Sequence, residues 1–116
     1  MGIQKFNEGS PNLSMLGYVS IYVDSENVSK WLVKTPKTFF SALESLGNSY
    51  GIILQRKLFS CFIRKWVYVY DIALNYRYRV ELVPRSNQKN NVDMNIVTTV
   101  IRETYNAQNI STVIIV

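Results

Sequence analysis

The run YVSIYV, at residues 18–23, constrains the fold more than any other feature of the sequence, and it ends at Asp24. The run is continuous and rich in β-branched and aromatic residues, which is typical of a strand covered on both faces. Such strands belong mainly to parallel sheets, because the helical crossovers between parallel strands cover both faces. We therefore predict an α/β fold in which 18–23 is the first strand of the core.

Two helical segments are predicted after this strand. The stretch SENVSKWLVK carries apolar residues at helical spacing, and Thr35 followed by Pro36 is typical of a helix start, with an N-cap and then proline at the first helical position. The predicted core face of the second helix consists of Phe39, Phe40, Leu43 and Leu46. Gly47 and Asn48 predict its end, with Gly51 as the alternative.

The central part of the chain predicts two strands and a helix between them. Residues 52–54 form a short apolar strand followed by a basic pair, Arg56 and Lys57, and residues 58–63 either continue that strand or form a loop. The segment WVYVYDIALNYR fits both a strand and a helix, and we favour the helix because a parallel sheet needs a crossover before its next strand. That next strand covers residues 78–83.

The last part of the chain predicts one more helix and one more strand. A polar loop, RSNQKNN, leads into a helix, and residues 111–116 form the final strand. The predicted apolar face of that helix consists of Met94, Val97, Val100, Ile101 and Tyr105. The alternation of strands and helices predicts a small doubly wound, mostly parallel, Rossmann-like sheet with helices on both faces. We expect residues 1–16 to be a flexible leader and residues 17–116 to be a single domain.

Composition excludes several kinds of chemistry. The sequence has no histidine and a single cysteine, Cys61, which removes imidazole bases, Cys/His nucleophiles and an intrachain disulfide and fits a reducing cytoplasm. No apolar run approaches the roughly 20 residues of a membrane span, so we expect a soluble protein. The formal charge of +5 suits a polyanionic partner such as RNA, although a solvated basic surface gives the same count.

Two carboxylates are the candidate chemical groups. In doubly wound folds ligands bind at the carboxyl ends of the strands, where Asp24 is expected. A buried carboxylate there needs a metal, a cation or helix amides, so Asp24 is either a ligand or a helix cap, and Asn27 is either a turn former or a second polar group of the site. Asp93, at the start of the last helix, is either a partner of the helix dipole or a second carboxylate for Mg²⁺ or Mn²⁺.

Basic residues are predicted near the same edge. Lys89 lies in the loop before the last helix, and Arg56 and Lys57 follow the neighbouring strand. These side chains could neutralise the phosphates of a substrate, or they could be solvated residues of surface loops.

Several of these segments, in this order and spacing, resemble the NYN domains, which are PIN-like metal-dependent ribonucleases. The resemblance covers residues 18–116 and is carried by SIYVDSENV, GNSYG, YRVELVP, QKNNVDMNIVTTVI and NISTVIIV. It implies that Asp24 and Asp93 bind Mg²⁺ or Mn²⁺, that Asn27 organises the site, and that Lys89 contacts phosphate. Two departures accompany it: Thr99 occupies a position where the family usually has another acid, and the acidic turn expected after the last strand does not follow Val116. We therefore expect a domain that is incomplete at its C-terminus.

Three functional hypotheses follow. The first is a ribonuclease domain of the NYN/PIN-like type, which hydrolyses RNA phosphodiesters with a divalent metal in its complete form. The second is a non-catalytic module of the same fold that binds RNA, a protein partner or a second copy of itself through Arg56, Lys57, Arg85 and Lys89. The third is a receiver-like signalling domain with Asp24 as a phosphorylated or cation-binding acid, although the paired acids after the first strand and a further Asp after a later strand are missing.

Overall fold

The fold is an α/β domain, seen in a computed structural model that describes residues 2–5, 17–84, 91–106 and 109–116. Its strands are β1 (Gly2–Lys5), β2 (Tyr18–Asp24), β3 (Ile52–Ser60), β4 (Arg79–Leu82) and β5 (Ile110–Ile115). Its helices are α1 (Ser29–Lys34), α2 (Pro36–Tyr50), α3 (Val67–Asn75) and α4 (Asn91–Asn106), with a short 3-10 turn, η2 (Arg64–Trp66), before α3.

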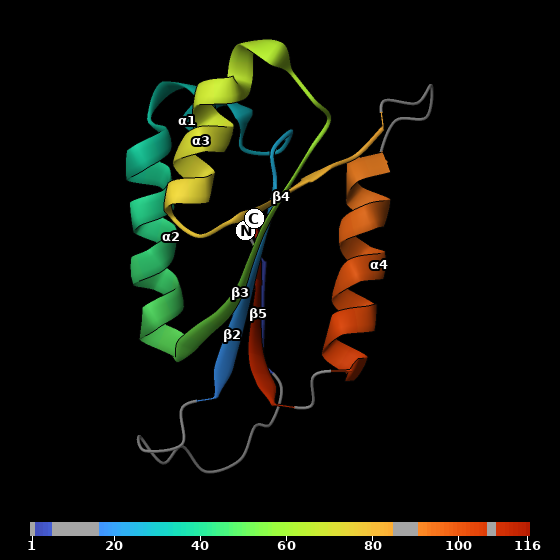
Figure 1. The fold of residues 1–116 in the computed structure, drawn as a ribbon. Helices are drawn as coiled ribbons and strands as arrows, with labels where there is room; N and C mark the ends of the chain where they lie inside the picture. Colours follow the sequence, from blue (N-terminus) through green and yellow to red (C-terminus); the bar gives the residue numbers. More distant parts are fainter. Residues whose placement is uncertain (1, 6–16, 85–90, 107–108) are drawn as a thin grey trace.

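One five-stranded sheet forms the centre of the domain. The strand order is β1-β5-β2-β3-β4, and every pair is parallel except β1 with β5. Helices α1, α2 and α3 cover one face of the sheet, and α4 covers the other (Figure 1). The predicted mostly parallel, doubly wound architecture with helices on both faces is confirmed.

The alternation of side chains along β2 divides the core in two. Ile21 and Val23 are fully buried on the face that packs against Leu32 of α1 and Phe40 of α2. Tyr22 points to the opposite face, where it packs in a smaller cluster with Phe59, Val113 and Ile96 of α4. Because both faces of β2 are covered, residues 19–24 are buried on either face.

Most predicted elements lie where the sequence indicated. The second helix begins after Thr35, with Pro36 in its first turn, and the segment WVYVYDIALNYR contains α3, so both helix predictions are confirmed. Helix α2 continues through Gly47 because this glycine is buried against Ile21 and Ile53, where a larger residue would clash. The helix ends at Gly51, whose φ of 155° is rarely adopted by other residues.

The predicted core face of α4 is right for Val100, which packs against the cluster of Tyr22 and Ile96, and wrong for three other residues. Val97, Ile101 and Tyr105 are exposed, whereas Ile96 and Thr99 are buried against the sheet. The sequence places apolar residues on two sides of this helix. The side that packs against the sheet also carries Glu103, which forms an ion pair with Lys57 of β3. Residues 91–94, including the predicted core residue Met94, are described for their backbone only.

The N-terminal segment also differs from the prediction. Residues 2–5 do not form a leader outside the fold but form β1, which pairs with β5 from Gly2 opposite Ile115 to Lys5 opposite Thr112. Residues 1 and 6–16 of the predicted leader lie outside the described residues. Strand β1 therefore covers the outer edge of β5.

Candidate functional site

The carboxyl ends of three neighbouring strands meet around Asp24. Its backbone amide donates a 2.8 Å hydrogen bond to the carbonyl oxygen of Val116, which follows β5. The amide of Ser25 donates a 3.1 Å hydrogen bond to the carbonyl oxygen of Phe59 in β3. These bonds fix the end of β2 between its two neighbours. The prediction that Asp24 ends a central strand at the carboxyl edge is confirmed.

The carboxylate of Asp24 is held in a tight turn. Only 2% of the residue is exposed, and its Oδ1 accepts a 3.0 Å hydrogen bond from the backbone amide of Glu26. The N-cap of α1 is Val28, so Asp24 is not the cap of that helix. Asp24 instead stabilises the turn between β2 and α1, as aspartate commonly does two residues before a backbone amide.

Ser25 is a residue of this edge that the sequence analysis missed. It is 1% exposed, and its hydroxyl has no hydrogen-bond partner among the described residues. A buried hydroxyl without a partner costs about 1–3 kcal/mol, so such groups are rare in folded proteins. The only sequence signal was its position directly after the strand-ending acid. Asn27, two residues further, is exposed and lies in the same turn.

The second predicted acid lies at the same side of the sheet. Helix α4 begins at the side toward which the parallel strands run (Figure 1), and Asp93 is in its first turn. The structure describes the backbone of Asp93 but not the position of its carboxylate. The loop residues Arg85 and Lys89, predicted as phosphate contacts, lie outside the described residues.

Arg56 and Lys57 do not lie at the strand end. Strand β3 continues to Ser60, and these residues pair with Ile21 and Tyr22 in the middle of β2. Their side chains point to opposite faces of the sheet. This part of the prediction is wrong because the apolar run in residues 52–54 covers only the first third of the strand.

Both basic residues form ion pairs with the covering helices. The guanidinium of Arg56 contacts Glu44 of α2 with two nitrogens, Nε and Nη2, the latter 3.1 Å from Oε2. The ammonium of Lys57 pairs with Glu103 of α4. Their side chains are only 15% and 16% exposed, so these cations stabilise the packing of the helices on β3.

A second basic pair, which the sequence analysis did not single out, follows β3. Arg64 and Lys65 are exposed in the turn that leads from the strand to α3, together with the exposed ring of Phe62. The segment FIRKW, directly after the apolar strand, contained the signal. These side chains, rather than Arg56 and Lys57, follow the carboxyl end of β3.

A metal ion at this edge would have to be held by the acidic residues that lie there. The described residues contain no group of three or more acidic or cysteine side chains that could hold a metal ion. Mg²⁺ needs fewer, since it commonly binds through one or two carboxylates and completes its shell with water and phosphate. Asp24 and Asp93 are residues of the required type at the required edge.

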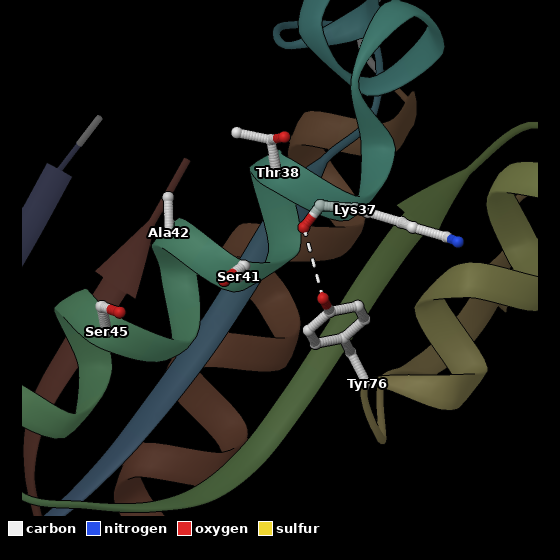
Figure 2. A pocket seen from close by; sticks show the side chains of 6 residues that line it. All are labelled: Lys37, Thr38, Ser41, Ala42, Ser45 and Tyr76. Atoms are coloured by element: carbon white, nitrogen blue, oxygen red, sulfur yellow. Dashed lines mark hydrogen bonds between the residues drawn. The ribbon is translucent and has the colours of Figure 1, made fainter.

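A shallow hollow on the outer surface of α2 does not belong to this edge. It has a volume of about 470 Å³ and is lined by Lys37, Thr38, Ser41, Ala42, Ser45 and Tyr76 (Figure 2). The hydroxyl of Tyr76 donates a 3.4 Å hydrogen bond to the carbonyl oxygen of Lys37 at one end of the hollow. None of the predicted site residues lines it.

Comparison with known proteins gives no match, so the function is inferred from the fold and from the residues at the carboxyl edge. No family model matches the sequence, and no match was found among curated proteins or solved structures. Within the described part of the chain, no helix has the length and apolar character needed to cross a membrane.

Proposed function

We propose that this chain is an NYN/PIN-like domain whose activity is the metal-dependent hydrolysis of RNA phosphodiesters at the carboxyl edge of the sheet. One observation carries the proposal: the buried Asp24 ends the central strand, and the helix with Asp93 in its first turn begins at the same side of the sheet. The hydrogen bond from the amide of Glu26 needs an acceptor oxygen, which the uncharged side chain of asparagine would also supply.

The two carboxylates would hold the cation in this proposal. A bound Mg²⁺ or Mn²⁺ supplies a water of lowered pKa and charge stabilisation for the leaving oxygen. Asp24 is suited to orient such an ion, because its strand is fixed on both sides and one of its oxygens is held by the amide of Glu26. Asn27, exposed in the same turn, would hydrogen-bond a phosphate or a ribose in this proposal.

Asp24→Asn tests this proposal without disturbing the turn. The amide oxygen of asparagine still accepts the bond from Glu26, whereas the negative charge is lost. We expect the variant to lose Mn²⁺ binding, measured by titration calorimetry, and any Mn²⁺-dependent cleavage of single-stranded RNA. Asp71→Asn, at an exposed position of α3, is the control and retains both. Mn²⁺ binding or cleavage that survives Asp24→Asn contradicts the assignment.

A non-catalytic RNA-binding module is the second candidate, and a specific observation favours it. Thr99, where the resembled family usually has an acid, is 7% exposed and faces the sheet, so it contributes no carboxylate to the edge. This candidate predicts RNA binding that weakens with salt and needs no divalent metal. In that case Asp24→Asn leaves RNA affinity unchanged, and wild-type protein shows no Mn²⁺-dependent cleavage.

A further inference from the structure

The ring of Phe62 is exposed and yet held in place. Phe62 follows β3 by two residues, and 56% of it is accessible to solvent. One side of the ring stacks on Tyr70 of α3, with centroids 6.2 Å apart and planes inclined by 30°. An exposed aromatic ring that is already packed on one side loses little conformational freedom when a ligand covers the other.

The hydroxyl of Tyr70 fixes the backbone on which Phe62 lies. It is 3.0 Å from the hydroxyl of Ser60, accepts a 3.1 Å hydrogen bond from the amide of Ile63 and donates one of 3.2 Å to the carbonyl oxygen of Cys61. Tyr70 itself is only 8% exposed. The residues directly before and after Phe62 are therefore both hydrogen-bonded to α3.

Phe62 lies close to the carboxyl edge and among cations. Phe59, three residues before Phe62, is the β3 residue paired with Asp24. Three residues of chain span at most about 11 Å, so Phe62 lies within that distance of Phe59. Arg64 and Lys65 follow Phe62 two and three residues later, and both are exposed. A positively charged surface with an open aromatic face is the combination that binds single-stranded nucleic acid, since the cations contact the backbone and the ring stacks on a base.

We propose that Phe62 is a stacking platform for a base of single-stranded RNA and that Arg64 and Lys65 contact the adjoining phosphates. The proposal rests on the proposed function, because it assigns how the same edge holds its RNA. A duplex does not fit this surface, since its bases are already stacked on one another and offer no free face to a protein ring.

Phe62→Ala is the decisive variant, and fluorescence anisotropy with a labelled single-stranded oligoribonucleotide in EDTA is the assay. EDTA separates binding from metal-dependent cleavage. Loss of one stacked base weakens binding by about 5- to 150-fold. Phe62→Trp retains the wild-type affinity. Leu74→Ala is the matched control, because Leu74 is 57% exposed on α3 and its truncation leaves the affinity within about twofold.

Salt dependence separates the ring from the cations. In a plot of log affinity against log salt, Lys65→Gln makes the negative slope shallower by about 0.7, the value for one phosphate contact on a single strand. Phe62→Ala leaves this slope unchanged. Replacing one nucleotide of the oligoribonucleotide by an abasic residue weakens wild-type binding at the contacted position and has no effect there in Phe62→Ala.

Three results would overturn the platform: equal effects of Phe62→Ala and Leu74→Ala, equal wild-type affinity for a duplex of the same sequence, or no wild-type binding to the single strand. None of them decides the proposed hydrolysis, which is tested separately by Asp24→Asn with Mn²⁺. Conversely, a Phe62-dependent affinity without Mn²⁺-dependent cleavage supports the platform and contradicts the hydrolytic activity.

Discussion

Lys57→Met distinguishes a structural cation from an RNA contact. The Lys57–Glu103 pair lies between β3 and α4, and its side chains are 16% and 14% exposed. Breaking a fully buried pair costs about 3–5 kcal/mol and breaking a surface pair about 0–1 kcal/mol. At this exposure we expect a loss of about 2 kcal/mol, because methionine retains the packing of the lysine stem but leaves the Glu103 carboxylate without its partner.

Urea unfolding measures this loss. A decrease of about 2 kcal/mol lowers the midpoint by about 1 M for a domain of this size. The double variant Lys57→Met/Glu103→Met recovers most of the stability, since an apolar pair can replace a buried ion pair at little cost. RNA affinity of the folded Lys57→Met protein remains within about twofold of wild type. A variant with unchanged stability and weakened RNA binding would refute the structural role and restore the original phosphate-contact prediction.

Three further predictions concern the sheet and its termini. Burial, together with the nearby Glu103 carboxylate, raises the pKa of Tyr22 to about 12. The unfolded tyrosine titrates near pH 10, so the stability that the protonated Tyr22 contributes to the fold is fully present below pH 10 and is lost by pH 12, at a little over 1 kcal/mol per pH unit. Between pH 8 and pH 11, the free energy of urea unfolding should therefore decrease less in Tyr22→Phe than in wild type. Equal decreases would contradict this shift. A Cβ on Gly51 would lie 2.2 Å from the carbonyl oxygen of Gly17, so Gly51→Ala should destabilise the domain by at least about 2 kcal/mol in thermal unfolding, and an unchanged midpoint would exclude this conformation. Removal of residues 1–5 should bare the edge of β5 and cause concentration-dependent self-association in light scattering, whereas a truncated chain that stays monomeric would show that this edge needs no cover.

The sequence was most informative where a single local rule determines the structure. The run that ends at Asp24, the start of α2 at Pro36, and the strand at 110–115 each follow from residue types over a few positions, although the Thr35 side chain makes no capping hydrogen bond. The helix at 67–75 was resolved by topology, because parallel strands need a crossover between them. These elements together predict the order of layers and the edge at which a site would form.

The differences arise where the decision depends on distant residues. Which side of α4 is buried depends on its partners in the sheet, among them Lys57, which pairs with Glu103 46 residues later in the chain, and helical periodicity alone does not specify it. Arg56 and Lys57 alternate across the sheet inside β3, a pattern that resembles a polar strand end until its partners are known. The pairing of β1 with β5 joins four residues near the start of the chain to its last strand, and no local signal marks it.

The position of β2 also determines when this protein can fold during its synthesis. Tyr18 pairs with Ile110, 92 residues later in the sequence, so one side of the central strand remains without its neighbour until β5 has left the ribosome. At about 5–20 residues per second this interval lasts about 5–20 s. During that time the strand exposes unpaired backbone and apolar side chains to other chains. We therefore expect the nascent protein to depend on chaperones and to aggregate more readily during expression than the finished domain does.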